Sequence, residues 1–364
     1  MRGTALQIAA GLMSPIGDEI ARISEQHVLA RRPYVNRRGL SVVANVSIIG
    51  GKKVYRELPL GPHVNATLRK DEWVKLDERL IESSRERLVI IDDLRAAGLT
   101  YSVGGLGTII SEWEASSEIA DAEVTMDGET QAEQDRQEFT INGVPIPVIQ
   151  KPFKIGERVL LASRTRGAAL DVTTGVEASR SVARTSENMV FNGTTLGAVK
   201  SAANTYQIFG LTNFPGRALG TISDWSSPAV TPETILTEIL ALVQTMETSH
   251  RKYGPFTLYV PNTYSFQFRR DFKANGDRTL LQRVLAEPVI KAVRVSDVLA
   301  DGNVILIQLT SDVIDLAVGA DITNIQWASP SGWTNYFQTF AAWAPRIKQD
   351  YDDRAGYIHA TVGT

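Results

Sequence analysis

The sequence contains no cysteine among its 364 residues, and this absence excludes several kinds of chemistry at once. Without thiols the chain forms no disulfide, no thiolate metal site and no cysteine nucleophile. A chain of this kind fits a reducing cytosol, or a particle that is assembled there.

Long apolar runs are also missing. No stretch approaches the roughly 20 consecutive apolar residues that a membrane-spanning helix needs. The opening segment, MRGTALQIAAGLMSPIGDEI, is only mildly apolar and is interrupted by Pro15, Asp18 and Glu19, so it makes a poor signal peptide. We therefore expect a soluble intracellular product with no membrane partner.

Charge of either sign is not in large excess, because 38 basic residues face 41 acidic ones and the formal net charge is −3. A protein whose main task is to coat nucleic acid would be strongly basic, so this class is disfavoured. The hydrophobic fraction of 43% is ample for a core. At this length we expect one large domain or two to three interleaved domains.

Signatures of catalysis are scarce as well. The histidines have neither the i, i+4 spacing of a metal-binding helix nor an HExxH pattern, and no GxGxxG or GxxxxGK[ST] loop is present. Neighbouring carboxylates such as Glu112 with Glu114 are too common to mark an active site. We expect no catalytic residue, no cofactor and no metal. The four histidines are His27, His63, His250 and His359.

Apolar periodicity predicts a mixed α and β chain. A helix over about 70–97 should stop at Gly98, and a helix rich in small residues over about 171–191 should end at Asn192-Gly193. Thr231-Pro232-Glu233 is a good helix start, and the helix–strand alternation over about 229–330 predicts a compact α/β domain. Further helices are predicted over 16–32, 263–272 and 278–286, and strands over 41–49, 255–260, 289–295, 303–309 and 313–319, followed by a β-prone aromatic tail.

The segment GVPIPVIQ (143–150) alternates apolar residues with Pro145 and Pro147. Proline cannot donate to a strand ladder, so such a segment belongs at a sheet edge or in one arm of a loose hairpin. The chain offers it no evident local partner. Ten acidic residues and one basic residue lie between 112 and 138, whereas five basic residues and one acidic residue lie between 151 and 166. We interpret 101–165 as a long protruding loop with an acidic and a basic strand-like arm.

Several spaced segments resemble one known family. The run GVPIPVIQKPFKIGERVLLASRTRGAALD, then VEASRSVARTSENMVFNG and YQIFGLTNFPGR, is similar to the Hong Kong 97 (HK97)-type major capsid proteins of tailed phages. The likeness is closest to the branch that shares the linocin/encapsulin-like domain. HRKYGPFTLYVPNTYSF and VIKAVRVSDVLADGNVILIQLTSDVIDLAVG extend the resemblance, which covers about 65–360. LRKDEWVKLDERLIESSRERLVIIDDLRAAGLT (68–100) resembles the phage branch and is not expected in minimal encapsulin shells.

The resemblance implies an α+β, HK97-type capsid fold. Its parts would be an N-terminal arm and lead-in (1–65), a helix of the peripheral region (66–100), an extended E-loop (101–165), a peripheral domain with a long spine helix (166–228), an α/β axial domain (229–330) and return strands of the peripheral domain (331–364).

An E-loop that reaches over a neighbouring subunit would explain the proline arm, because a neighbour covers its edge and proline keeps that edge from recruiting other strands before assembly. The oppositely charged arms would meet across symmetry-related contacts, although two separately solvated faces explain the charges equally well. The expected subunit-contact residues are Glu129, Asp135, Arg136, Pro145, Pro147, Lys151, Lys154, Arg158 and Arg164. The candidate DNA-facing residues are Arg31, Arg32, Arg37 and Arg38. The alternative is that these side chains are simply charged groups in contact with water.

Three functions follow in order of preference. The first is a non-enzymatic major capsid protein that assembles as pentamers and hexamers into an icosahedral virion shell around double-stranded DNA, in the host cytoplasm, with scaffold, portal and decoration proteins as further partners. The second is an encapsulin-type shell around a cargo enzyme. The third, far behind, is a soluble enzyme with an unrecognised site.

Overall fold

The computed structural model describes residues 33–35, 41–49, 52–59, 79–80, 82–83, 88–116, 139–166, 173–194, 199–200, 205–273, 278–328, 333–350 and 354–363. The chain divides into two compact units. Unit 1 comprises Met1–Ser83, Lys151–Ser179 and Thr323–Thr339, and unit 2 comprises Ser84–Gln150, Arg180–Ile322 and Phe340–Thr364. The predicted helix over 16–32 lies outside the described residues.

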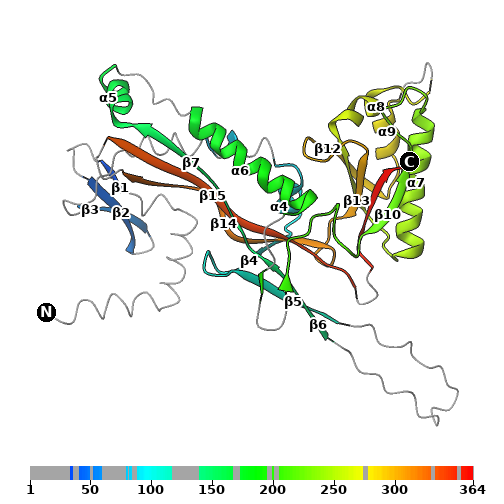
Figure 1. The fold of residues 1–364 in the computed structure, drawn as a ribbon, viewed down its shortest axis with the longest axis horizontal. Coiled ribbons are helices and arrows are strands. Elements are labelled where there is room, and N and C mark those ends of the chain that lie inside the picture. Colours follow the sequence, from blue (N-terminus) through cyan, green and yellow to red (C-terminus); the bar gives the residue numbers. More distant parts are fainter. Residues whose placement is uncertain are drawn as a thin grey trace, which may run out of the picture. The chain divides into compact units, whose positions relative to one another are not determined.

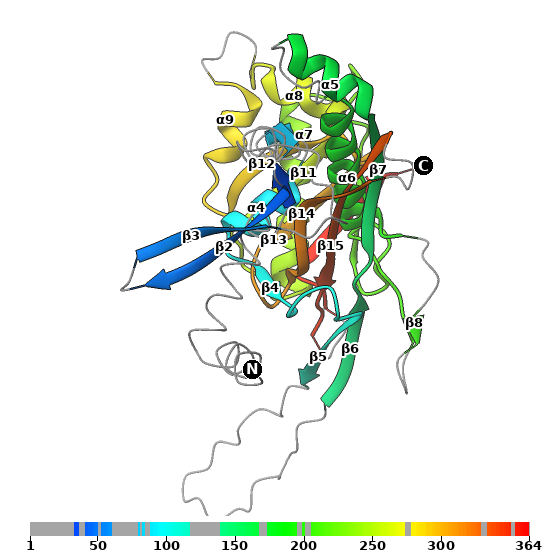
Figure 2. The same cartoon turned by 90° about the vertical axis from the view of Figure 1, so that its left-hand side faces the viewer.

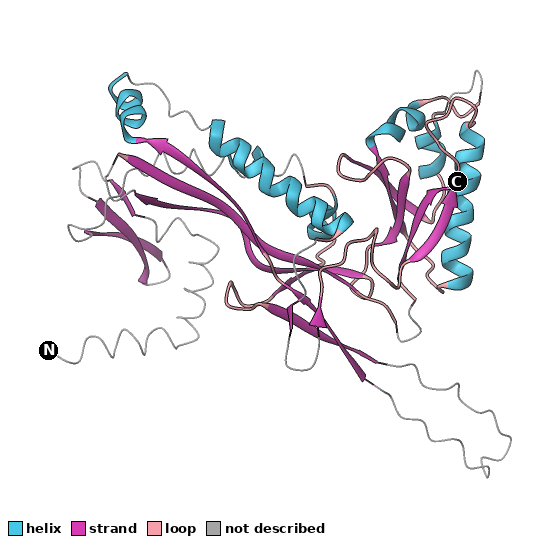
Figure 3. Cartoon of the chain, viewed as in Figure 1, coloured by secondary structure: helices cyan, strands magenta, loops and turns pink. Residues whose placement is uncertain are grey.

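Helices and strands are mixed throughout the described residues (Figure 1, Figure 3). The helices are α4 (Ile90–Ala96), α5 (Glu157–Arg166), α6 (Thr173–Asn192), α7 (Pro232–Ser249), the short 3-10 helix η2 (Asn262–Tyr264), α8 (Ser265–Arg269) and α9 (Leu280–Leu285). The strands are β1 (Pro33–Val35), β2 (Ser41–Ile49), β3 (Lys52–Pro59), β4 (Thr100–Ser102), β5 (Ile110–Ser116), β6 (Phe139–Pro145), β7 (Val148–Gly156), β8 (Val199–Lys200), β9 (Thr205–Tyr206), β10 (Ala218–Ile222), β11 (Phe256–Pro261), β12 (Ile290–Ser296), β13 (Asn303–Gln308), β14 (Ile314–Ala328), β15 (Thr334–Ile347) and β16 (Tyr357–Val362).

Unit 1 contains an antiparallel sheet of order β1-β2-β3. It also holds α5 and most of β7. The rings of Phe153 on β7 and Phe337 on β15 stack with centroids 5.1 Å apart. The α5 start is fixed by Glu157, whose backbone N–H donates to the Trp333 carbonyl at 2.9 Å and whose Oε2 accepts from Asn335 Nδ2 at 2.7 Å. Helix α5 was not predicted, and it ends the strand-like return arm at Gly156.

Unit 2 contains a mixed five-stranded sheet of order β10-β16-β13-β11-β12. β10 runs parallel to β16 and β12 parallel to β11, whereas β13 is antiparallel to both β16 and β11. Helix α7 lies along this sheet (Figure 1). It begins as predicted, because the Thr231 side chain accepts from the Thr234 N–H and Pro232 follows at the first position. Its buried apolar stripe is Ile235, Leu236, Ile239, Leu242, Val243 and Met246.

The predicted domain boundaries remain predictions, but the sheets show how the segments combine. β10 and β16 lie in the same sheet as β11, although their residues fall outside 229–330. β14 falls inside that range but belongs to a second sheet of order β4-β14-β15-β7. The strands predicted over 41–49, 255–260, 289–295, 303–309 and in the aromatic tail are confirmed as β2, β11, β12, β13, β15 and β16.

The helix predicted without a break over 70–97 is interrupted. Leu88 and Val89 are not helical, and α4 starts at Ile90. The reason is a buried carboxylate: Glu187 of α6 accepts from the Val89 N–H at 3.1 Å and the Ile90 N–H at 2.8 Å, so neither amide continues a preceding helix. The predicted stop is confirmed, since Gly98 has a φ of 72°.

Candidate assembly surface

The proline arm is paired within its own chain, and the prediction that it lacks a local partner is wrong. β5 and β6 form an antiparallel hairpin in which Ile110 faces Pro145 and Ser116 faces Phe139. The two strands run side by side in both views (Figure 1, Figure 2). Proline is tolerated because Pro145 is the last residue of β6 and Pro147 lies in the break before β7. Pro145 is buried and Pro147 is half-buried.

The inner face of this hairpin packs on the core of unit 2. Ser111 and Val144 form one cross-strand pair, with relative exposures of 4% and 3%. The neighbouring Trp113 packs against the apolar core, and its ring lies 5.7 Å from the guanidinium carbon of Arg346. The inner face therefore anchors the hairpin to the unit that carries it.

Arg346 is the centre of a buried charged cluster beneath the hairpin. Its Nη2 donates to Oδ2 of Asp315 at 2.6 Å, and both side chains are less than a tenth exposed. The Lys348 ammonium donates to the same carboxylate oxygen at 2.8 Å. The Arg346 guanidinium lies 4.0 Å from the centre of the Tyr101 ring. Two cations and stacked rings thus compensate one buried carboxylate and hold β4, β14 and β15 together at this point.

The outer face of the hairpin has a different character. Phe139 is 63% exposed and Ile141 is 51% exposed, and the acidic Glu114 lies directly opposite Ile141. At its base the face ends under Tyr206, whose ring leaves no room for a Cβ at Gly143. Large apolar side chains in water next to a carboxylate are typical of a surface that another protein covers.

The other predicted contact residues are distributed as follows. Lys151 and Lys154 on β7 and Arg158 on α5 are exposed side chains of unit 1, and Arg164 lies in α5. Glu129, Asp135 and Arg136 lie outside the described residues, and so do the candidate DNA-facing arginines Arg31, Arg32, Arg37 and Arg38. Whether these residues make subunit contacts stays a prediction.

Glu187 was not identified as a candidate from the sequence. Its side chain is the most deeply buried carboxylate among the described residues, and it lies where α6 packs against the start of α4. It is 1% exposed, and only its Oε1 accepts the two α4 amides, because Oε2 has no hydrogen-bond partner among the described residues. Burial raises the pKa of Glu187 to about 7, against the opposing effect of the backbone N–H groups of α4. The junction of α4 and α6 is therefore sensitive to pH near neutrality.

No cluster of three or more His, Cys, Asp or Glu residues has metal-binding geometry in the part of the chain that the structure describes. His359 is buried, its Nε2 lies 2.8 Å from Oδ1 of Asn303, and burial lowers its pKa to about 4, with a further contribution from Arg217. Within the same described residues, no helix is both long and apolar enough to cross a membrane.

Comparisons with known proteins find matches that cover most of the chain. A family model described as a family of unknown function (DUF6260) matches residues 63–360. The type 1 encapsulin shell protein EncA of Myxococcus xanthus (strain DK1622) is 25% identical over 293 residues, which are 79% of this chain and 92% of that protein.

Two solved structures have similar folds. The virus-like particle from Pyrococcus furiosus gives a TM-score of 0.54 at 18% identity and covers 79% of this chain and 98% of its own. The capsid of Myoviridae phage XM1 gives a TM-score of 0.54 at 12% identity, with 73% and 89% coverage. The predicted HK97-type fold class is confirmed by these likenesses. Since the family model spans most of the chain, the protein belongs to the family of unknown function DUF6260, with the HK97 fold of capsid-type proteins.

Proposed function

We propose that this chain is the major capsid protein of a tailed phage, and that many copies assemble into an icosahedral shell that encloses double-stranded DNA. The observation that carries the proposal is the β5–β6 hairpin, which is anchored on its inner face and exposes Phe139 and Ile141 on its outer face. In a single chain these apolar side chains stay in water and add nothing to stability, whereas a neighbouring copy that covers them would stabilise the contact by burying them.

The magnitude of that contact suits a shell. Full burial of one large apolar side chain contributes about 1.5–3 kcal/mol, so covering the exposed parts of Phe139 and Ile141 contributes roughly 2–3 kcal/mol. Association costs about 4–15 kcal/mol, so one such contact does not hold two copies together. Closed symmetry repeats the contact around every copy, and the sum then exceeds the cost.

Partners and location follow from the same proposal. The shell is built from pentamers and hexamers in the host cytoplasm and becomes the virion, and scaffold, portal and decoration proteins join it. Arg31, Arg32, Arg37 and Arg38 face the DNA, and the near-balanced net charge of −3 suits a container that must release its contents. The role of the chain is structural, with no reaction of its own.

A second candidate is an encapsulin-type shell that encloses a cargo enzyme. The 25% identity to the encapsulin shell protein, over 92% of that protein, favours it. The phage reading is supported by the similarity of the fold to the phage XM1 capsid and by the segment 68–100. The two candidates share the shell and differ in its contents.

The test is electron microscopy of the purified full-length chain after gel filtration, with DNA and protein assayed in the particles. Closed particles are expected. Heads or tubes of larger and variable size, filled with DNA when made during infection, agree with the capsid proposal, whereas small uniform particles with a protein cargo favour the encapsulin candidate. A chain that stays monomeric even at high concentration contradicts both.

A face-specific variant tests the hairpin itself. Phe139→Ser with Ile141→Ser removes the apolar outer face, and we expect particles to be lost or to need at least about tenfold more protein, in line with the lost burial. Thr140→Ser is the matched control, because Thr140 lies between them on the opposite face of β6. Equal assembly of both variants would show that the outer face makes no contact.

A further inference from the structure

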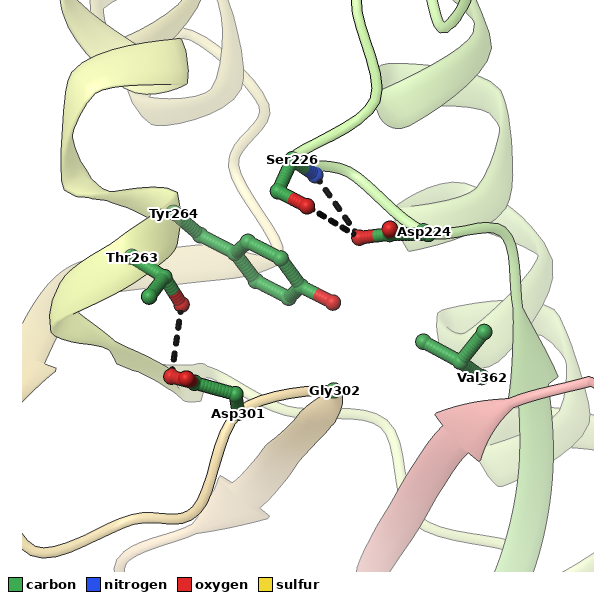
Figure 4. Close-up of a pocket in the computed structure, with 7 residues that line it drawn as sticks. All are labelled: Asp224, Ser226, Thr263, Tyr264, Asp301, Gly302 and Val362. Carbon is green, nitrogen blue, oxygen red and sulfur yellow. Dashed lines mark hydrogen bonds between the residues drawn. The ribbon is translucent and has the colours of Figure 1, made fainter.

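A cleft of about 250 Å³ opens at one end of the five-stranded sheet of unit 2 (Figure 4). It is enclosed by the loop after β10, by η2, by the turn before β13 and by the end of β16. The residues that matter for its chemistry are Asp224, Ser226, Thr263, Tyr264 and Asp301. None of them belongs to the hairpin surface described above.

Two carboxylates are fixed in this cleft. Asp224 Oδ1 accepts from the Ser226 backbone N–H at 3.0 Å and from the Ser226 hydroxyl at 2.7 Å, and Asp301 Oδ1 accepts from the Thr263 hydroxyl at 2.9 Å. The hydrogen bond from the Ser226 hydroxyl lowers the pKa of Asp224. No lysine or arginine in the described ranges forms an ion pair with either carboxylate. The cleft therefore carries negative charge that no described lysine or arginine of its own unit balances by an ion pair.

A buried phenol points into the same space. Tyr264 is 1% exposed, and its hydroxyl is directed toward Asp224 and Val362 (Figure 4). Burial, followed by the charge of Asp224, raises the pKa of Tyr264 to about 12. The phenol thus keeps its proton at neutral pH, and its oxygen remains available as a hydrogen-bond acceptor.

These groups define the chemistry of the occupant. The two fixed carboxylates repel an anion, and their charge also makes the cleft too polar for an apolar ligand. A divalent metal would find only two carboxylates, and the described residues offer no third acidic or histidine ligand. A guanidinium or ammonium group fits, because it donates several hydrogen bonds at once to carboxylates and to a phenol oxygen.

The same unit displays such groups on two described stretches between α8 and α9, 270–273 and 278–279, which are bridged in antiparallel fashion through Asp271 and Thr279 and are called the basic hairpin below. The Phe272 N–H donates to the Arg278 carbonyl at 2.9 Å, and the Leu280 N–H donates to the Arg270 carbonyl at 2.9 Å. Around this hairpin Arg269, Lys273 and Arg278 are exposed. Among the described residues, neither of these two arginines is ion-paired, and Lys273 reaches only Glu233, at 3.9 Å between two exposed side chains.

We propose that the cleft of one copy receives an arginine or lysine side chain from the basic hairpin of a second copy. This inference rests on the proposed shell function. It adds to that function a specific contact between neighbouring copies within one pentamer or hexamer. A cleft on one copy and a hairpin on the next make a head-to-tail contact, and such contacts close into rings when the rotation between copies is constant. The ion pairs fix the register of neighbours more than they add affinity.

The absence of cysteine allows a direct test with introduced thiols. Ser226→Cys places a thiol in the cleft, and Asp271→Cys places one on the basic hairpin, while both carboxylates and all three cations stay intact. The two single variants are purified separately, mixed, assembled and oxidised. We expect a mixed disulfide dimer, identified by mass spectrometry, as the main product. Thr248→Cys on the exposed side of α7 replaces Ser226→Cys in the control mixture and should not crosslink.

A charge variant tests the chemistry of the contact. Asp224→Asn with Asp301→Asn should raise the protein concentration needed for assembly at least about tenfold, since two charge-assisted contacts are lost per copy. Asp297→Asn with Glu247→Gln removes the same charge elsewhere in the unit and is the control. Thermal unfolding followed by circular dichroism establishes that both variants are folded.

The outcomes separate this inference from the proposed function. If wild-type chains form particles but the mixed disulfide is absent, or if both charge variants assemble alike, the cleft contact is wrong and the shell function stands. If the unassembled wild type binds Ca²⁺ and Asp224→Asn with Asp301→Asn abolishes that binding, the cleft holds a metal ion and the inference is also wrong. Wild-type chains that never associate overturn both.

Discussion

Replacing Glu187 with glutamine should make the stability of unit 2 less dependent on pH. The carboxyl group has a pKa of about 7 in the folded chain against an ordinary value of 4.5, because it is buried. A folded-state pKa above the unfolded one means that the neutral acid stabilises the fold fully below pH 4.5. This contribution is lost as the pH rises through 7.

The magnitude follows from the difference between the two pKa values. Each pKa unit corresponds to about 1.4 kcal/mol, so the wild type loses about 3 kcal/mol between pH 4.5 and 8 through this group. Glutamine resembles the neutral acid. Its carbonyl oxygen takes the place of Oε1 and accepts the Val89 and Ile90 amides, and its NH₂ takes the place of Oε2, which has no partner among the described residues. The unpaired NH₂ costs about 1–3 kcal/mol at every pH.

The assay is urea unfolding of unassembled chains, followed by tryptophan fluorescence at several pH values from 4.5 to 8. The free energy of unfolding of Glu187→Gln minus that of the wild type should rise by about 3 kcal/mol across this range, whatever its starting value. Taking the difference cancels groups that titrate in both proteins. Glu177→Gln removes a carboxylate from an exposed position of α6 and is the control. A difference for Glu187→Gln that stays constant with pH would refute the reasoning.

Three further outcomes are expected. Arg346→Met should lower the free energy of unfolding by about 3–5 kcal/mol, because it leaves Asp315 buried with one cation fewer; a loss under 1 kcal/mol in urea unfolding would contradict this. Gly210→Ala should cost at least about 2 kcal/mol in the same assay, since its Cβ would collide with the backbone of Gly193 at the end of α6; unchanged stability would show that the two segments can separate freely. Folding lowers the pKa of His359 from 6.5 to about 4, so the contribution of its neutral form to stability is fully present above pH 6.5 and is lost as the pH falls toward 4. His359→Gln should therefore shift the midpoint of acid unfolding, followed by circular dichroism, to lower pH. An unchanged midpoint would exclude this histidine as a cause of acid unfolding.

The elements that could be predicted from the sequence are those whose signals are local. Helix α7 has its cap, its proline and its apolar stripe within 18 consecutive residues, and the end of α6 at Gly193 is marked by the glycine itself, which has a φ of 69°. The proline-rich arm was recognised by its alternation. The acidic arm was also predicted to be strand-like, and β5 lies in it, but its pairing with the proline arm was not predicted, because Glu112 and Glu114 give no signal of which strand they lie beside.

The features that could not be predicted depend on residues far apart in the chain. The start of α4 is set by a carboxylate 97 residues away, at Glu187, and the Arg346–Asp315 pair joins two strands whose sequences look like ordinary sheet. The neighbours of β10 and β16 follow from tertiary packing alone. Most of the candidate contact residues could be named only from the resemblance, since exposed charge carries no signal of its own about what it touches.

The position of β16 in the sheet of unit 2 has a consequence for synthesis. Among the described strands of that sheet β10 pairs only with β16, and the first residue of β16, Tyr357, follows the last residue of β10, Ile222, by 135 positions. At about 5–20 residues per second, a ribosome needs roughly 7–27 seconds to cover that interval. The β5–β6 hairpin is synthesised before this interval. β13 is synthesised within it and lacks β16, its second neighbour in the sheet, until the interval ends. The sheet of unit 2 is therefore completed only after β16 has been synthesised.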